Sequence, residues 1–241
     1  MKEILILGDV HANYPALKKI GEYLQLDRFE RIINTGDLTV YSTFPNETIR
    51  WFRHLKDLSV CILGNTDKRI LRMLKGKKLK KPKNKDKRLM YFWTSDNLST
   101  KNIDYLRSLP PKSELTLDGI RMGVFHGCAD NPNAKLFPST PDSRLIELAK
   151  SYPYDIHIVG HSHVPFHRVA AGVHFINPGS VGRMFDGDPR TSFAILKVLP
   201  GEFEVEHFRI PYPVEDVVKG LKQHSLPDIY CRMFRKGKKL N

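Results

Sequence analysis

The strongest constraint on the fold is a glycine beside a metal-competent side chain at the end of each of five predicted strands. The five pairs are Gly8-Asp9, Gly36-Asp37, Gly64-Asn65, His126-Gly127 and Gly160-His161. Apolar runs precede them, and helical patterns separate the first three, so the chain opens as β-α-β-α-β. Such units give parallel strands with right-handed crossovers. The polar strand ends should therefore meet at one edge of a sheet.

The N-terminal half is predicted as strands over 2–7, 31–35 and 59–63. One helix should follow Asn13, whose side chain suits a cap, and another should run from a cap at Asn46 to about Leu58. Ser99 and Thr100 can cap a short helix that ends before a pair of prolines.

The C-terminal half has a different pattern. Segments 114–117 and 120–125 flank an Asp-Gly pair and predict a hairpin. Helices are expected over 141–151 and 214–222, with short strands at 156–159, near Phe166 and Phe175, and over 193–198 and 203–208. Parallel units followed by antiparallel strands predict two mixed sheets packed together with helices outside.

At 241 residues the chain is expected to form a single domain, residues 1–241. Its apolar N-terminal run is too short for a signal sequence or a membrane span, so we expect a cytoplasmic protein. The three cysteines are widely separated and show no paired spacing, which predicts free thiols.

Positive charge is concentrated in two segments. The formal net charge is +13, and twelve Lys and Arg lie between Lys68 and Arg88 against one Asp. We expect residues 75–88 to form an exposed, mobile, lysine-rich loop, because the segment is too poor in apolar residues to bury a core. Residues 232–241 are expected to form a basic C-terminal tail. The loop either recruits polyanions or only aids solubility.

Paired polar residues at the strand ends point to metal binding. Residues two apart in an extended segment face the same side, so Asp9 with His11, and His161 with His163, can each present two ligands. Each pair alone is also common in surface turns, and the prediction depends on five such elements occurring in order. The candidate ligands are Asp9, His11, Asp37, Asn65, His126, His161 and His163.

The ordered motifs GDVHAN, GDL, GNTD, FHG and GHSH resemble the calcineurin-like metallophosphoesterase superfamily. INPGSVG and DGDPRTSFAIL resemble its prokaryotic branch of uncharacterised phosphoesterases and diadenosine tetraphosphatases. The resemblance implies an α/β fold, a four-layer α/β/β/α sandwich with a dinuclear centre. It also implies a ligand assignment in which Asp37 bridges the ions, with Asp9, His11 and His163 on one ion and Asn65, His126 and His161 on the other.

The expected reaction is metal-dependent hydrolysis of a small phosphorylated substrate. Imidazole and carboxylate ligands suit two divalent ions of Mn, Fe, Co, Ni or Zn. Such a site keeps a positive charge, and a metal-bridging hydroxide would attack the phosphorus of a phosphodiester or phosphoanhydride. We assign catalytic roles to Asp37, Asn65 and His126.

Three further residues bear on specificity. Many relatives have a histidine where this chain has Thr66, and a hydroxyl cannot act as a general acid at pH 7, which predicts a bias toward diesters and anhydrides with good leaving groups. Asp67 is expected either to orient a ligand from behind or to cap a turn. Arg183 is expected either to contact a substrate phosphate or to be solvated.

Two other functions stay open at this point. A nuclease would use the segment Lys68 to Arg88 to recruit nucleic acid or another polyanion. A metal-binding scaffold without catalysis, like a retromer subunit with this fold, would not need all seven ligands.

Overall fold

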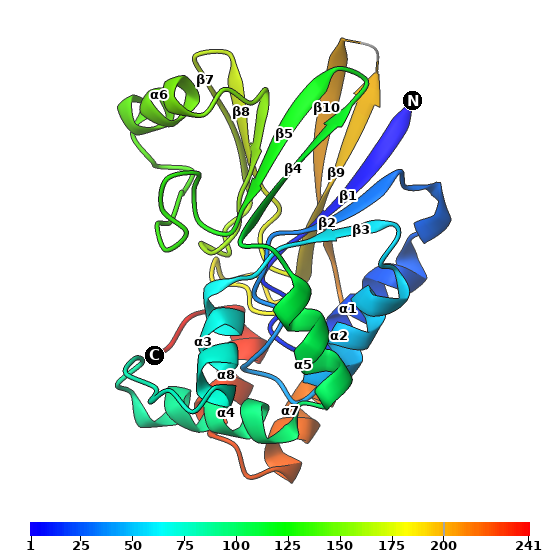
Figure 1. Ribbon diagram of the computed structural model, residues 1–241. Coiled ribbons are helices and arrows are strands. Elements are labelled where there is room, and N and C mark those ends of the chain that lie inside the picture. Colours follow the sequence, from blue (N-terminus) through cyan, green and yellow to red (C-terminus); the bar gives the residue numbers. More distant parts are fainter. Residues whose placement is uncertain (200) are drawn as a thin grey trace.

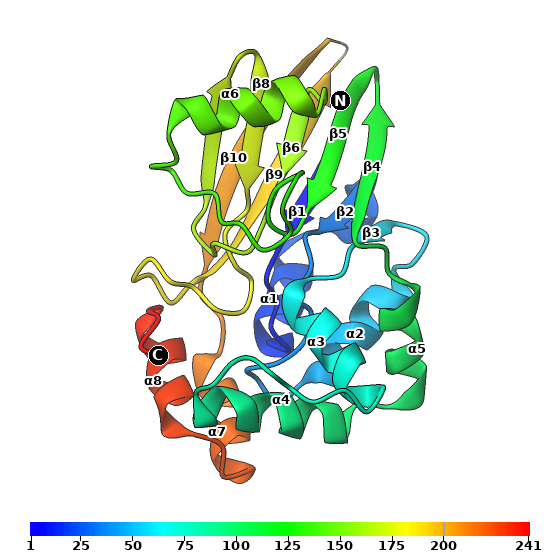
Figure 2. The ribbon, with the colours of Figure 1, turned by 60° about the vertical axis from the view of Figure 1, so that its left-hand side comes forward.

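The computed structural model describes residues 1–199 and 201–241, in which two five-stranded sheets are stacked face to face with helices outside (Figures 1 and 2). The strands are β1 (Lys2–Leu7), β2 (Arg31–Asn34), β3 (Ser59–Cys61), β4 (Lys112–Leu117), β5 (Ile120–Phe125), β6 (Ile156–Ile158), β7 (Phe166–Ala170), β8 (Val173–Asn177), β9 (Thr191–Leu199) and β10 (Glu202–Ile210). The helices are α1 (Tyr14–Tyr23), the short η1 (Leu26–Arg28), α2 (Pro45–His54), α3 (Asn65–Leu74), α4 (Lys85–Asn97), α5 (Thr100–Ser108), α6 (Asp142–Ser151), α7 (Val214–Gln223) and α8 (Asp228–Lys236). The expected α/β/β/α sandwich is confirmed.

Both sheets mix parallel and antiparallel neighbours, as predicted. The first has the order β10-β9-β1-β2-β3, in which β1, β2 and β3 run parallel and β9 pairs antiparallel with both β1 and β10. The second has the order β4-β5-β6-β8-β7, with β5, β6 and β8 parallel. The predicted hairpin is the β4–β5 pair, closed by Asp118 and Gly119, both at positive φ.

The alternation of side chains along β1 explains the layers. Ile4 and Ile6 are fully buried between the two sheets, whereas Leu5 and Leu7 are buried against the helices on the opposite face. A strand covered on both faces must be apolar at consecutive positions, which is why the run is continuous. The helix α6 covers the outer face of the second sheet through Leu145 and Leu148 (Figure 2).

The segment after β1 is held against the segment after β2 by backbone hydrogen bonds. The amide of Asp9 donates to the carbonyl of Gly36 at 3.2 Å, and the amide of His11 donates to the carbonyl of Asp37 at 2.8 Å. The polar strand ends therefore lie at one edge of the sandwich, beside the helical lobe that contains α3, α4, α7 and α8 (Figure 1).

Both predicted boundaries of the second helix are wrong. Asn46 does not cap α2, which begins at Pro45 and ends at His54. The Asn46 side chain instead accepts hydrogen bonds from the Ser99 amide at 3.0 Å and from Asn102 at 2.8 Å. It therefore ties α2 to the start of α5, a tertiary contact with no local sequence signal.

The two basic segments are partly helical, which corrects their expected extents. Residues 75–84 contain no helix or strand, but Lys85 to Arg88 form the first turn of α4, because Asn84 accepts a hydrogen bond from the Lys87 amide. Residues 232–236, expected in the tail, belong to α8. That helix forms because Tyr230, Met233 and Phe234 bury one face at helical spacing.

All three cysteines are buried free thiols. Within residues 1–199 and 201–241, no helix combines the length and the apolar character required to cross a bilayer.

Candidate metal centre

The structure gathers the predicted ligands at the polar edge of the sandwich. Two groups have ligand atoms that lie within 4.8 Å of one another: Asp9, His11 and His163 in one, and Asp37, His126 and His161 in the other. Asn65, the first residue of α3, lines the same cavity of about 120 Å³ as Asp37 and His161. All seven residues therefore lie at this edge, although more than 150 positions separate the first from the last.

In the first group, three electron-pair donors face one another. The Nε2 atoms of His11 and His163 lie 3.2 Å apart, and the Oδ1 atom of Asp9 lies 3.3 Å from Nε2 of His163. The Nδ1 atom of His11 faces the carbonyl of Thr39 at 3.2 Å, and that of His163 faces the carbonyl of Arg183 at 2.5 Å. A carbonyl can only accept, so both rings carry their proton on Nδ1 and present the Nε2 lone pair to the group.

The second group is built in the same way. Nδ1 of His126 donates to the carbonyl of Thr35 at 2.9 Å, and its Nε2 points to Oδ1 of Asp37 at 3.6 Å. The other carboxylate oxygen of Asp37 lies 3.7 Å from Nε2 of His11, which belongs to the first group. Asp37 therefore faces both groups.

These side chains fit divalent cations and little else. Oδ1 of Asp9 and Nε2 of His126 are buried and have no hydrogen-bond partner among the described residues. Facing lone pairs repel, and buried acceptors without partners are costly, unless a cation lies among them. Imidazole nitrogens oriented by carbonyls, together with carboxylates, form the donor set that Mn, Fe, Co, Ni and Zn share.

The protonation states also suit metal binding. Burial lowers the pKa of His11 to about 3 and that of His161 to about 4, so both imidazoles are neutral at pH 7. Burial alone would raise the pKa of Asp37, but the neighbouring His126 and His11 outweigh it and lower that pKa. Neutral imidazoles and ionised carboxylates are the forms that bind a cation.

The backbone at the ligands corrects one sequence argument. Asp9, His11, His161 and His163 all have positive φ, between 49° and 66°, and Asp37 has φ 57°. They are not extended, so the rule that residues two apart face one side does not apply. His161 and His163 accordingly belong to different groups. Left-handed backbone at non-glycine residues costs about 1–3 kcal/mol each and clusters at functional sites.

Gly64 allows α3 to approach Asp37. A Cβ added at Gly64 would lie 2.0 Å from Oδ1 of Asp37 and 2.2 Å from its backbone nitrogen. The Thr66 amide, in the first turn of the same helix, donates to that Oδ1 at 2.8 Å. The helix N-terminus thus supports the carboxylate that faces both groups.

Asp67 acts from behind the ligands. Its carboxylate accepts hydrogen bonds from the amides of Leu38, Thr39 and Gly64 at 3.0 to 3.1 Å, and from the Thr39 hydroxyl at 2.7 Å. Burial and the neighbouring Asp37 raise the pKa of Asp67 to about 6. These contacts cap α3 and fix the segment that follows Asp37.

Arg183 is a buried cation at the same cavity, with 7% of its surface exposed. Its guanidinium lies 3.8 Å from the ring centroid of Tyr41, and it has no acidic partner within 4.0 Å in the described residues. The solvated alternative is therefore wrong, because the charge is buried beside the candidate ligands.

Four more cationic side chains line the same cavity, and the sequence did not show that they meet there. The cations that line it with Arg183 are Arg69, Lys87, Lys135 and Lys239. Burial and the charges of the other cations lower the pKa of Lys87 and of Lys135. Arg69 and Lys87 belong to the basic segment Lys68 to Arg88 and Lys239 to the basic tail, but only tertiary packing brings them and Lys135 to one cavity.

Known proteins resemble this chain over the residues that form the candidate metal centre. A family model described as a calcineurin-like phosphoesterase superfamily domain matches residues 1–200. An uncharacterized protein of Methanocaldococcus jannaschii is 28% identical over 242 residues, covering 93% of this chain and 94% of that protein. A symmetrical bis(5'-nucleosyl)-tetraphosphatase of Sodalis glossinidius is 32% identical over 106 residues, 44% of this chain and 36% of that enzyme. The crystal structure of a metallophosphoesterase from Sphaerobacter thermophilus has a TM-score of 0.79 and 26% identity, covering 98% of this chain and 99% of its own.

Proposed function

Because the chain belongs to the prokaryotic branch of the calcineurin-like phosphoesterase superfamily and is a metal-dependent phosphoester hydrolase, we propose that it binds two divalent ions and hydrolyses phosphodiester or phosphoanhydride bonds. The observation that carries the proposal is the position of Asp37. One of its oxygens lies 3.6 Å from Nε2 of His126 and the other lies 3.7 Å from Nε2 of His11. A carboxylate that faces two groups of donors is suited to bridge two ions.

Asn65 and His126 complete the catalytic assignment. Asn65 begins α3 and lines the cavity beside Asp37, so its amide oxygen completes the donor set of the second group. Two divalent ions held by these residues would supply Lewis-acid chemistry and would activate a water for attack on phosphorus. The carbonyls of Thr35, Thr39 and Arg183 keep His126, His11 and His163 in the tautomer required for binding.

The cations at the mouth favour a substrate with negative charge beyond the reacting phosphate. Arg183 is held by the Tyr41 ring at one wall, and Lys87 and Lys135 lie at the opening. They can neutralise the phosphoryl oxygens that face away from the ligands. Thr66 offers no general acid, so a leaving group that departs unprotonated is favoured. These features support diesters and anhydrides over alkyl monoesters.

A metal-reconstitution assay tests the proposal. Purified protein is stripped with chelator, reloaded with Mn²⁺, Ni²⁺, Co²⁺ or Zn²⁺, and assayed against an aryl phosphodiester, an aryl monoester and a dinucleoside polyphosphate. We expect hydrolysis of the diester and the anhydride, and a loss of more than about 100-fold in Asp37→Asn, since losing even the partners behind a ligand costs 10–100-fold.

Asp57→Asn is the matched control, because Asp57 is exposed and lies in the turn between α2 and β3, at the opposite end of β3 from Asn65. It should retain full activity. Uniform inactivity with every metal would contradict the proposal and favour the non-catalytic scaffold.

A further inference from the structure

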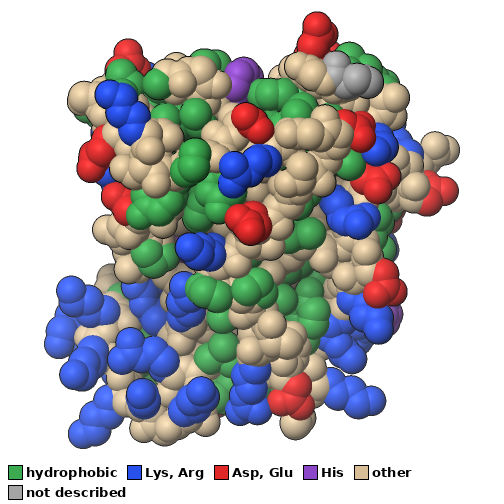
Figure 3. All heavy atoms as spheres, turned by 45° about the horizontal axis from the view of Figure 1, so that its top comes forward, with side chains coloured by type: hydrophobic (Ala, Val, Ile, Leu, Met, Phe, Trp, Pro, Cys, Tyr) green, Lys and Arg blue, Asp and Glu red, His purple; other side chains and the backbone are tan. Residues whose placement is uncertain are grey.

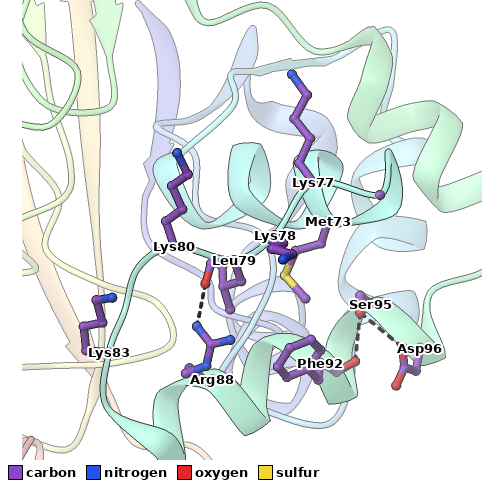
Figure 4. Close-up of a pocket in the computed structure, with 11 residues that line it drawn as sticks. Met73, Lys77, Lys78, Leu79, Lys80, Lys83, Arg88, Phe92, Ser95 and Asp96 are labelled. Carbon is purple, nitrogen blue, oxygen red and sulfur yellow. Dashed lines mark hydrogen bonds between the residues drawn. The ribbon is translucent and has the colours of Figure 1, made fainter.

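A second basic feature lies outside the metal centre, in a hollow between the end of α3 and the face of α4. The hollow has a volume of about 800 Å³ and is lined by Lys77, Lys78, Lys80, Lys83 and Arg88, with Met73, Leu79 and Phe92 as its apolar walls. Figure 4 shows Lys77, Lys80 and Lys83 extending toward the top of the view, on the side of the segment that faces away from α4. In the space-filling view, Lys and Arg side chains gather at the lower left, whereas acidic residues are concentrated in the upper part and at the right (Figure 3).

The hollow and the metal centre are linked by residues that line neighbouring hollows. An intermediate hollow of about 320 Å³ shares Lys77 to Lys80 with the large hollow and shares Arg69 with the cavity of the metal centre. Along α3, Arg69 and Met73 are about 6 Å apart, since the helix rises 1.5 Å per residue. Consecutive phosphates of one strand of a duplex repeat about every 3.4 Å of helix axis, so this stretch of α3 alone spans about two phosphates.

These cations are available to a ligand. Among the described residues, none of Arg72, Lys77, Lys80 and Lys83 has an acidic partner within 4.0 Å. Asp96 is the one acidic residue that lines the large hollow in the part of the chain that the structure describes. A basic surface without counter-charges attracts a polyanion.

The hollow is shaped before any ligand binds, and it offers an aromatic ring. The Arg88 guanidinium donates to the carbonyls of Leu79 and Pro82, which holds the lysine-rich segment across α4. Phe92 is 44% exposed, and the Arg88 guanidinium lies 5.6 Å from its ring centroid. An exposed ring among cations can stack on a nucleobase while the cations contact phosphates.

We propose that residues Arg69 to Phe92 form a binding track for single-stranded nucleic acid that leads into the metal centre. The cavity at the ligands, about 120 Å³, has room for one phosphodiester but not for the rest of an extended substrate. The remaining nucleotides therefore lie on the surface, and the track is the cationic surface that adjoins the cavity. A flexible single strand can follow the track and still place one phosphate at recessed ligands such as His11, whereas a rigid duplex cannot. This assignment of the substrate class rests on the proposed hydrolase function.

The test measures binding separately from catalysis. Fluorescence anisotropy of a labelled twelve-nucleotide thymidine strand is followed in EDTA, so that no cleavage occurs, at several salt concentrations. The variants are Lys77→Glu combined with Lys80→Glu, and Phe92→Ala. The control is Lys56→Glu combined with Lys150→Glu, because both lysines are exposed, Lys56 follows α2 and Lys150 lies on α6, on the outer face of the second sheet. The control makes the same charge change, so it isolates the effect of position.

We expect the double track variant to weaken binding at least tenfold and to reduce the slope of log K against log salt by about 1 to 2, since each phosphate contact contributes about 0.7 for single strands. Phe92→Ala should weaken binding by about 5-fold or more without changing that slope, because stacking is not ionic. The control should stay within twofold of wild type.

Three results would overturn the track: no binding by wild type, an equal loss in the control, or displacement of the strand by equimolar dinucleoside polyphosphate. Hydrolysis of the aryl diester by wild type is measured in the same preparation. Its absence would overturn the proposed function, whereas the binding comparison would still decide the track.

Discussion

Replacing Gly64 by Ala should disrupt the metal centre through a single methyl group. Gly64 has φ −81° and ψ 179°, which alanine adopts without strain, so the residue's backbone does not require glycine. The added Cβ would lie 2.2 Å from the backbone nitrogen of Asp37, whereas ordinary van der Waals contact begins at 3.4 Å. Asp37 or the start of α3 must therefore withdraw by about 1 Å, which is several times the tolerance of about 0.2 Å on a metal–ligand distance.

The expected cost follows from that displacement. Overpacking of a buried site costs about 1–3 kcal/mol, and a misplacement of about 1 Å at reacting groups costs on the order of 100-fold in rate. We expect Gly64→Ala to lower the free energy of unfolding by about 2 kcal/mol. Its affinity for Mn²⁺ should fall by about 10-fold or more, because Asp37 no longer faces both groups of donors.

Gly21→Ala is the matched control for this variant. Gly21 lies within α1, and a Cβ there would meet its nearest neighbour, Nε1 of Trp51, at 3.6 Å. Alanine should therefore stabilise that helix by about 0.5–1 kcal/mol and leave metal binding unchanged. Urea unfolding and calorimetric titration with Mn²⁺ compare the two variants. If Gly64→Ala matches wild type in both measurements, the close approach of α3 to Asp37 does not control the site, and the steric reasoning is wrong.

Three further predictions address the leaving group, pH and the metal. Thr66→His should raise turnover of an alkyl monoester by at least about tenfold by supplying a general acid, measured as phosphate release; no gain would contradict the role given to Thr66. Burial lowers the pKa of His157 from its ordinary value of 6.5, so the folded state disfavours the protonated imidazole. The contribution of this group to the free energy of unfolding is therefore fully present above pH 6.5 and is lost as the pH falls below it. Urea unfolding at pH 7.5 and pH 5 should show His157→Phe losing less stability than wild type, by up to about 2 kcal/mol, and equal losses would refute this. Chelation should lower the urea midpoint of wild type, with Mn²⁺ at 100 times its dissociation constant restoring about 2.7 kcal/mol, whereas Asp37→Asn should respond far less.

The sequence predicted the layers of the fold because they depend on local patterns. The continuous apolar run of β1 reports burial on both faces, and the Asp118-Gly119 pair reports the hairpin turn. The role of Asn46 was missed because its partners, Ser99 and Asn102, are more than 50 residues away. The helix α4 was missed because its amphipathic pattern is weak and its first turn is rich in lysine.

The same distinction between local patterns and tertiary contacts applies to the candidate site. Its ligands were predicted because each follows a strand, and the carboxyl ends of parallel strands meet at one edge. The grouping of His161 and His163 could not be derived from their spacing, since positive φ at both residues turns them to different groups. Lys135 and Lys239 were not predicted at all, because tertiary packing alone brings their segments to the cavity.

This division bears on where substrate specificity resides. The ligand atoms lie at strand ends, where residues such as Asp9 are buried and have left-handed backbone. Substitutions at these residues would therefore disturb both the fold and the reaction. The cations at the mouth and along α3 lie on helices and connecting segments outside the sheets, and exchanging them costs little stability. Charge changes at Lys77 or Lys87 should therefore alter which phosphate esters are bound while the fold and the ligand geometry persist. A substrate preference that changed only with substitutions at the strand ends would show that the metal centre itself selects the substrate.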